Sequence, residues 1–320
     1  MAVNTNTNET YDVSTIREDL QDALISISPT DTPFMTAIGR RNVDNTYFEW
    51  GVVSLAAADS ANRVIEGEAS PGNDAATNAI RQANYTQISD KVVEVSDTAN
   101  AVNGAGNAQT TAKQVAYKLK ELKRDMETML TANVAASAGA SGTARQTAGL
   151  PAFLRTNADR GTGGADGTTS GTGVSGYVDA AATDGTQRAV TEALLKSVIA
   201  DCWDEGAEPS LVLCGSSQKQ TISTFTGNAT KYKDITDKTL SAAIDVYVSD
   251  FGELTIVPSR FSRSRDVLVL DPNYARVAYL KPTTQKELAR TGHSERRLIS
   301  VEYGLQIDNE AAHGVVADIS

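Results

Sequence analysis

Two cysteines and two histidines are the side chains of this 320-residue chain best suited to nucleophilic catalysis or metal binding. Cys202 falls on the apolar face of a predicted helix, and Cys214 ends an apolar run that predicts a strand. A thiol in apolar surroundings is poorly ionised and unreactive, so both are expected to be small buried side chains. His313 lies beside a predicted C-terminal strand, and His293 is the one other histidine. We therefore predict no catalytic residue and no metal ligand.

Residues 171–176, Gly-Thr-Gly-Val-Ser-Gly, match the Gly-x-Gly-x-x-Gly pattern of dinucleotide-binding loops. That pattern is specific when it follows a strand and opens a helix, and here neither element is predicted. A flexible glycine-rich loop is the better interpretation. The chain also contains no phosphate-binding Gly-Lys pair, no Gly-x-Ser-x-Gly and no His-Glu-x-x-His. We expect no cofactor and no enzymatic activity.

Residues 260–265, Arg-Phe-Ser-Arg-Ser-Arg, form the most basic short segment. Arginines with an aromatic residue among them could contact nucleic acid or an acidic partner. A solvated connection or a salt-bridged subunit edge is favoured instead, because charge runs are commonly surface features. The net charge of −11 also argues against tight, sequence-independent binding of nucleic acid.

Large apolar side chains are few for a chain of this length. Leu, Ile, Val and Phe number 67 of 320 residues, just above the roughly 20 % below which charged chains are disordered. The chain should fold, but with a thin core. No run approaches the ~20 apolar residues that span a bilayer, so no membrane association is expected. The polar N-terminus is unlike a signal peptide, and two cysteines fit a reducing cytosolic compartment.

The N-terminal segment, residues 1–44, is predicted to be an arm. Ile16 and Leu20 begin an apolar pattern at helical spacing that must end before Pro29. A second short helix is predicted from the N-cap Thr32 to Gly39. Such short helices are marginal in water and need a surface on which to pack.

A long two-stranded finger is predicted over residues 45–97. Residues 46–57 and 83–96 have the composition of strands, whereas residues 58–82 between them are polar and poor in core formers. A hairpin loop normally has two to five residues. This finger cannot bury itself and needs a partner outside its own chain.

The clearest helix is predicted over residues 108–136, where apolar residues repeat every three or four positions. At ~1.5 Å per residue it would be about 43 Å long. The residues of its apolar stripe are Val115, Leu119, Leu122, Met126 and Met129.

The remaining chain predicts a mixture of helices and strands. Residues 138–186 are rich in Gly, Thr and Ala, and 160–176 is the weakest candidate for order, a predicted surface insertion. The elements expected after it are a helix at 188–205 with Trp203 on its apolar face, a strand at 211–214, a helix from 216, a hairpin of 244–248 with 254–257, a pair of 267–270 with 275–280, and a half-buried strand at 299–307. The predicted class is α+β, with mixed or antiparallel sheet and one dominant helix.

This order of arm, finger, spine helix and α/β lobe resembles the Hong Kong 97-type fold of tailed-phage major capsid proteins. Short motifs strengthen the resemblance and cover most of the chain, least so over 138–186. They are IREDL at 16–20, ISPTDTPF at 27–34, EW at 49–50, EG at 66–67, ELKRDME at 121–127, DPNY at 271–274, EYGL at 302–305 and NEAAH at 309–313.

The resemblance implies a shell subunit that forms hexamers and pentamers of an icosahedral head around double-stranded DNA, without sequence-specific binding. It would assemble in the host cytoplasm, with portal and decoration proteins as further partners. The implied domains are the arm 1–44, the extended loop 45–97, a peripheral domain of 98–137 with 271–320, and an axial domain of 138–270. The residues expected at contacts between subunits are Ile16, Leu20, Phe34, Trp50, Arg63, Lys118, Lys120 and Arg124.

Charge suggests how such copies would meet. Residues 1–97 carry a net charge of −9 and residues 98–137 a net charge of +2, so arm and finger are expected to dock on the spine helix of neighbours. Some members of this fold cross-link the finger through lysine. Here Lys91 is the first lysine in the chain, so no cross-link through the finger tip is expected.

Three alternatives remain open. A cellular nanocompartment shell shares the fold but would enclose enzymes rather than DNA, and the motif at residues 28–34 favours the phage. A secreted adhesin or surface-layer protein is disfavoured by the N-terminus and the basic spine helix. An enzyme of unknown type is disfavoured by the empty motif search.

Overall fold

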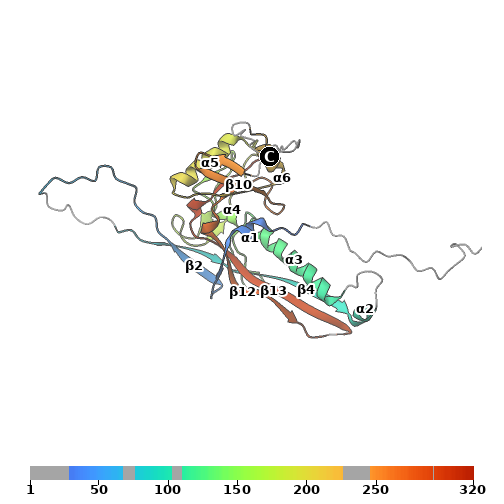
Figure 1. The fold of residues 1–320 in the computed structure, drawn as a ribbon. Helices are drawn as coiled ribbons and strands as arrows, with labels where there is room; N and C mark the ends of the chain where they lie inside the picture. The colour runs from blue at the N-terminus through green and yellow to red at the C-terminus, as the bar shows by residue number, and fades with distance from the viewer. Residues whose placement is uncertain (1–28, 68–75, 103–109, 226–245, 291) are drawn as a thin grey trace, which may run out of the picture.

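The computed structural model describes residues 29–67, 76–102, 110–225, 246–290 and 292–320. It has a lower lobe built on a four-stranded sheet and an upper lobe built on a six-stranded sheet (Figure 1). A two-stranded ribbon lies beside the lower lobe and continues outward as a long loop. Both sheets are mixed, so the predicted α+β class is confirmed.

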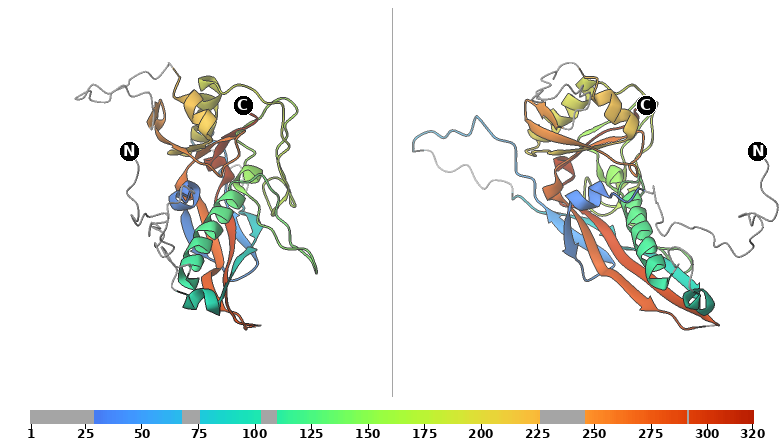
Figure 2. Two further views of the ribbon diagram at one scale, coloured as in Figure 1. Left: turned by 90° about the vertical axis from the view of Figure 1, so that its right-hand side faces the viewer. Right: turned by 45° about the vertical axis from the view of Figure 1, so that its right-hand side comes forward.

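The lower sheet has one parallel pair, β1 with β12, and is otherwise antiparallel. The long helix α3 (Thr111–Leu130) lies along it and contacts β4 and β13 (Figure 2). Its buried residues Leu122, Met126 and Leu130 belong to the core, which confirms an apolar stripe on this helix. The strands in sheet order are β1 (Gly39–Asn42), β12 (Ala275–Glu287), β13 (Ser294–Ile307) and β4 (Gln87–Ser96).

The spine helix is shorter than the predicted 108–136. It ends at Leu130, because the side chain of Asn133 is held by the main chain of residue 182. The Asn133 amide donates to the Ala182 carbonyl at 2.7 Å and accepts from the Ala182 N–H at 3.1 Å. A tertiary contact thus overrides a sequence that favours more helix.

The predicted finger differs from the structure in its return strand. Residues 83–96 form two elements, since β3 (Ile80–Tyr85) pairs with β2 (Tyr47–Val52), whereas β4 pairs with β13. Thr86 marks the break, and its hydroxyl donates to Glu302 at 3.0 Å. The return strand therefore joins the lower sheet after Tyr85, and the extended loop ends earlier than the predicted residue 97.

The short helix α1 (Pro33–Ala37) is confirmed, with Thr32 as its N-cap residue. It ends at Ile38 and the chain continues directly into β1, so Gly39 begins a strand instead of closing a helix. The buried carboxylate of Glu127 on α3 accepts from the N–H groups of Phe34 at 2.7 Å and Met35 at 2.9 Å. These bonds fix the entry of the arm to the spine helix.

The upper lobe places helices α5 and α6 against its six-stranded sheet. The predicted strand β8, helix α6 and hairpin β9–β10 are confirmed over the described residues. The helices are α5 (Glu192–Asp204) and α6 (Ser216–Ile222). The strands in sheet order are β5 (Ala158–Asp159), β14 (Gly314–Val316), β11 (Val267–Leu270), β8 (Leu211–Cys214), β10 (Gly252–Pro258) and β9 (Val246–Ser249).

The expected pairing of residues 267–270 with 275–280 is wrong. Strand β11 belongs to the upper sheet and β12 to the lower one, because the turn at Pro272–Tyr274 carries the chain between the lobes. The Asp271 side chain accepts from the Asn273 N–H at 3.1 Å and shapes this turn. The chain returns to the upper lobe after β13, so β14 lies in the six-stranded sheet beside β11 and β5.

Residues 138–186 are ordered by contacts with both lobes rather than forming a loose insertion. Helix α4 (Leu150–Phe153) is buried throughout, and the short strands β6 (Thr168–Thr169) and β7 (Val178–Ala180) form a small hairpin. The Ala83 N–H donates to the Gly176 carbonyl at 2.9 Å, which joins this segment to the ribbon. The glycine motif at 171–176 lies in the connection from β6 to β7, as a loop.

Strand β13 is more buried than its alternating sequence predicts. Residues Val301–Ile307 are all buried, because α3 lies on one face and the ribbon covers the other. Gly304 permits this approach, since a Cβ there would lie 2.8 Å from the Phe48 ring.

Replacement of Glu127 should destabilise the lower lobe. Glu127→Ala leaves two N–H groups at Phe34 and Met35 without their acceptor, which costs on the order of 2 kcal/mol in the free energy of unfolding. Denaturant titration of the unassembled subunit measures the loss. Glu121→Ala, which removes a partly exposed ion pair on the same helix, should change stability much less. Equal stability of Glu127→Ala and wild type would contradict the anchoring role.

Candidate functional site: assembly surfaces

Three of the four side chains best suited to catalysis, Cys202, Cys214 and His313, are buried in the upper lobe, whereas His293 is exposed between β12 and β13. Burial raises the pKa of Cys202 to about 12 and that of Cys214 to about 11, so neither thiol ionises near neutral pH. His313 is fully buried, and its Nδ1 accepts from the Asp271 N–H at 3.3 Å. Over the described ranges, no three His, Cys, Asp or Glu side chains are grouped as a metal site would need. None of the helices described is both long and apolar enough to cross a bilayer.

Two of the three arginines in residues 260–265 form ion pairs within the chain. Arg263 contacts Asp184 at 2.6 Å and Asp266 at 2.9 Å, and Arg265 contacts Asp318 at 2.7 Å. These pairs tie the segment to the loop before α5 and to the C-terminus. The segment is therefore an ordered, salt-bridged turn, which we call the arginine turn (residues 259–266).

The three most exposed of the large apolar side chains described, Leu55, Ile65 and Val64, lie on the extended loop beyond the ribbon. Leu55 is 84 % exposed and Ile65 is 76 % exposed, and Val53 and Val64 are also exposed. The described part of the loop projects away from both lobes (Figure 1), so neither lobe covers these groups. Burying one such side chain stabilises a complex by roughly 1.5–3 kcal/mol. The loop therefore carries apolar surface that a second molecule would bury.

Two of the residues expected at contacts between subunits lie in the chain's own core instead. Phe34 is buried beneath α1, and Trp50 is buried in the ribbon, where its indole N–H donates to Gln82 at 3.1 Å. An aromatic residue in an arm or a finger is apolar enough for either role, and here the lower lobe itself covers both. Ile16 and Leu20 lie outside the described residues.

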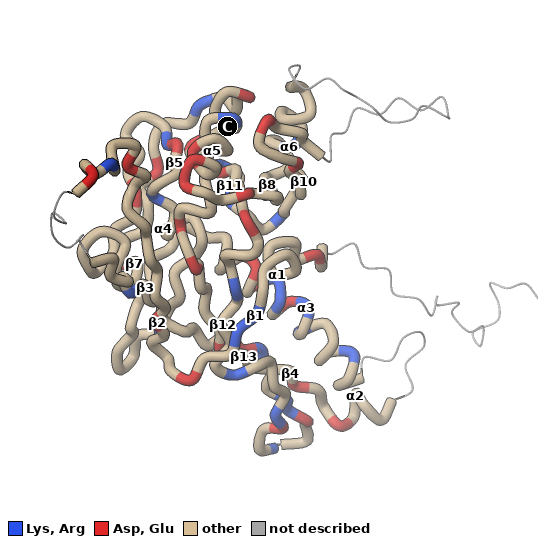
Figure 3. The backbone as a smooth tube through the Cα atoms, turned by 60° about the vertical axis from the view of Figure 1, so that its left-hand side comes forward, with Lys and Arg blue, Asp and Glu red and all other residues tan. Residues whose placement is uncertain are grey.

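The charged candidates remain at the surface. Arg63 is exposed on the extended loop and Lys120 is exposed on α3. Lys118 is partly buried and pairs with Glu121 at 2.8 Å. Arg124 is partly buried, with its guanidinium 6.0 Å from the centre of the Phe261 ring. Blue segments along α3 in Figure 3 mark its Lys and Arg positions.

An open groove lies between β4 and helix α2 (Asp97–Ala101), beside the first turns of α3. Its volume is about 390 Å³, and its apolar lining comes from Val92, Val93 and Val95, with Lys118 at its rim. Residues of β4 alternate between exposed and partly buried positions, so apolar side chains also point away from α3. Sequence reasoning missed this groove, since it treated β4 as part of the finger.

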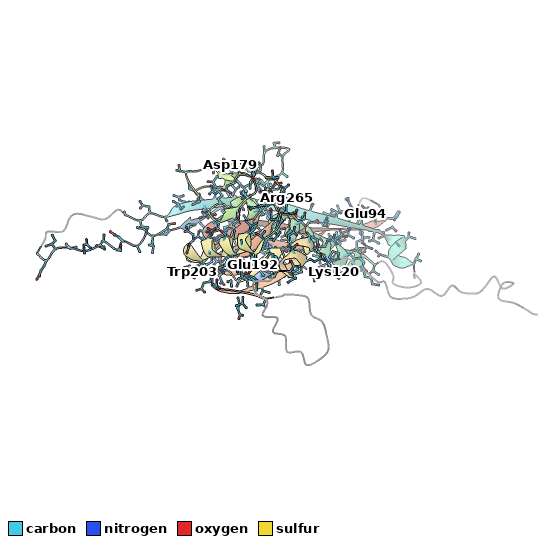
Figure 4. All side chains as sticks on the ribbon, turned by 90° about the horizontal axis from the view of Figure 1, so that it is seen from above. Glu94, Lys120, Asp179, Glu192, Trp203 and Arg265 are labelled. Atoms are coloured by element: carbon cyan, nitrogen blue, oxygen red, sulfur yellow. The ribbon has the colours of Figure 1, made fainter. Side chains whose placement is uncertain are left out.

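Trp203 is not on the buried face of α5 as predicted. Its side chain is 50 % exposed at the end of the helix, and its ring centre lies 5.2 Å from that of Phe251 in the β9–β10 turn. Trp203 is at the extreme end of α5, on the side from which the extended loop projects (Figure 4). The 3.6-residue pattern places it near the apolar stripe, but the buried residues of α5 are Leu195, Val198, Ile199 and Cys202, and Trp203 lies outside them.

Comparison with known proteins shows the family to which this chain belongs. The model of the SU10 major capsid protein family matches residues 3–320. The chain belongs to this family. It is therefore a major capsid protein, a structural component of the phage capsid, as the sequence motifs predicted.

One sequence relative and several solved structures agree with this assignment. The major capsid protein of Escherichia phage Phieco32 is 38 % identical over 104 residues, which cover 32 % of this chain and 29 % of that protein. The Cyanophage A-1(L) capsid asymmetric unit has a TM-score of 0.69 at 13 % identity, covering 97 % of this chain and 98 % of the other. A structure from Mycobacterium phage Cain has a TM-score of 0.63 at 12 % identity, covering 98 % and 99 %.

A nanocompartment shell also shares the fold. The holo-SrpI encapsulin complex from Synechococcus elongatus has a TM-score of 0.56 at 12 % identity and covers 95 % of this chain and 93 % of its own. Likeness at such identity shows the fold alone, and the Hong Kong 97-type fold is confirmed. The family match decides for the phage capsid.

His313 should make the stability of the subunit depend on pH. Burial lowers its pKa from 6.5 to about 4, so folding favours the neutral imidazole. Stability is complete above pH 6.5 and falls as pH decreases toward 4, by on the order of 3 kcal/mol. Denaturant titrations between these values measure the slope. His313→Asn should flatten it, whereas the exposed-site variant His293→Asn should keep it; equal slopes in all three proteins would contradict this.

Proposed function

We propose that many copies of this chain assemble into hexamers and pentamers, which close into the icosahedral head around the double-stranded DNA of a tailed phage. The exposed apolar loop carries the proposal. Its four large apolar side chains are each more than half exposed, and the family is one of capsid proteins. The subunit would assemble in the host cytoplasm, with portal and decoration proteins as later partners. No enzymatic step is required of it.

The apolar loop would act by lying across a neighbouring subunit. At roughly 1.5–3 kcal/mol per buried side chain, Leu55 and Ile65 alone would contribute several kcal/mol to each contact. A shell repeats that contact around every capsomer. The thin core of the single chain is then completed between chains.

The domain arrangement follows from the two lobes. The lower lobe, with α3 and strands β4, β12 and β13, would be the peripheral domain, and the upper lobe the axial domain. The structure supports two changes to the boundaries expected from the sequence: β4 goes to the peripheral domain, and β14 goes to the axial domain. Residues 1–28 would complete the arm.

Surface charge would add to apolar burial. Lys120 and Arg124 on α3 of one subunit would attract the acidic arm of a neighbour, in which Ile16 and Leu20 supply apolar contact. Arg63 on the extended loop would meet acidic groups of the subunit beneath it. Lys118, which already pairs with Glu121, would contribute least.

The nanocompartment shell is the second candidate, and the structural similarity to the encapsulin complex supports it. It differs from the phage head in its content. Shells that contain packaged DNA and a portal favour the head, whereas shells that enclose cargo enzymes favour the compartment.

Electron microscopy of the purified protein tests assembly directly. Wild type should form closed shells or capsomer rings. A variant with Leu55→Ser and Ile65→Ser should remain dispersed, with an unchanged far-UV circular dichroism spectrum, because both groups are exposed in the single chain. Asp59→Asn on the same loop is the matched control and should still assemble. Discrete wild-type monomers under all conditions, or normal shells from the double variant, would contradict the proposal.

Salt tests the charge contribution. Raising NaCl from about 0.05 M to about 0.5 M shortens the screening length severalfold and should raise the critical concentration for assembly. Lys120→Gln should reduce that salt response, while Lys286→Gln, which removes an exposed charge from β12, should not. Light scattering across a concentration series gives the critical concentration. An assembly indifferent to ionic strength would count against docking by charge.

A further inference from the structure

The pair of Trp203 and Phe251 forms a partly exposed aromatic patch, with side chains 50 % and 39 % exposed in the part of the chain that the structure describes. The two rings pack at 5.2 Å, yet both side chains remain open to solvent. Tryptophan and other aromatic side chains are the groups most often found at the centre of protein interfaces. Two of them together on one surface indicate a contact rather than a chance exposure.

Carboxylates surround this patch. Asp204 follows Trp203 and Asp250 precedes Phe251, and both are exposed. Lys196 is the nearby cation, and it already pairs with Glu192 at 2.8 Å. Lys196 also interacts electrostatically with Asp250, whereas Asp204 is a further exposed carboxylate beside the aromatic pair. The patch therefore combines an aromatic surface with partly compensated negative charge, which suits a cationic side chain such as arginine.

The arginine turn holds such a side chain at the opposite end of strand β10. Arg263 and Arg265 are engaged by carboxylates of their own chain, but Arg260 is exposed and has no ion pair among the described residues. The turn is rigid, since the Ser259 hydroxyl accepts from two main-chain N–H groups and Thr131 donates to the Phe261 carbonyl. Arg260 is thus presented outward from a fixed support.

We propose that Arg260 of one subunit docks on the Trp203–Phe251 patch of the next copy of this chain, beside Asp250. The inference rests on the proposed function and names one contact within a capsomer. The two partners lie at opposite ends of β10, which at ~3.3 Å per residue separates them by about 20 Å. They cannot meet within one molecule.

A contact between different surfaces of identical chains is heterologous, and it closes into a ring when the rotation between copies allows. The patch lies on the side from which the extended loop projects (Figure 4). The same neighbouring subunit could therefore contact both the patch and the loop. The arginine turn would then serve as a subunit edge. Residues 260–265 would then take part in a contact between subunits, because Arg260 is not used by the ion pairs of this segment within its own chain.

Charge exchange between copies tests the contact. Asp250→Arg places like charges against Arg260 of the neighbour, and Arg260→Asp does the same with Asp250. Each variant alone should raise the critical concentration for assembly by roughly tenfold or more. A one-to-one mixture of the two should form hexameric rings, because alternating copies restore an opposite pair at every contact of a six-membered ring, whereas a five-membered ring keeps one like-charged contact. The double variant Asp250→Arg with Arg260→Asp should also assemble.

Fluorescence of Trp203 provides a second readout. In a Trp50→Phe background Trp203 is the one tryptophan, and its emission should shift to the blue when wild-type surfaces assemble and cover it. Arg260→Lys should keep most of the assembly, and Arg260→Ala should lose it.

The outcomes separate this contact from the proposed function. Shells that form equally well from both single variants would overturn the contact and leave the capsid function standing. Single variants that fail both alone and when mixed would also overturn it, because an exchange between copies must be rescued by mixing. A wild-type protein that never assembles would overturn both.

Discussion

The burial of strand β13 on both faces is the constraint on which the rest of the structure depends. From Val301 to Ile307 it has the spine helix on one side and the ribbon on the other, with β12 and β4 as its neighbours in the sheet. Gly304 admits the Phe48 ring against the strand, and the Asn84 side chain donates to the Leu305 carbonyl at 2.7 Å. These contacts with β13 fix the position of the ribbon, and therefore the direction in which the extended loop projects.

The few large apolar residues lie mainly where they hold the ribbon, the helices and the two sheets in place. One buried cluster joins α1, the ribbon, α3 and the lower sheet, and a second lies between α5, α6 and the upper sheet. Little is left for the projecting loop except side chains that point into solvent. A chain built in this way holds its shape alone but leaves part of its apolar surface for other molecules.

Much of this arrangement could be predicted from the sequence because it is local. Periodicity locates α3, α5 and the β9–β10 hairpin, and short motifs point to the capsid family. The pairing of strands is not local: nothing in residues 83–96 shows that the chain changes partner at Thr86, or that Asp271 sends the next strand into a different sheet. Which side chains are exposed is harder still to predict from the sequence. Phe34, expected at a contact between subunits, is buried, whereas Trp203, expected on the apolar face of α5, is half exposed. Burial depends on which element lies opposite a side chain, and periodicity does not show that.

The two buried cysteines have a consequence for the life of such a particle. Cys202 and Cys214 are the chain's full complement of thiols, and their pKa values of about 12 and about 11 keep both protonated at neutral pH. Disulfide exchange and oxidation begin from the thiolate. A folded subunit therefore keeps both thiols unreactive when it is exposed to air.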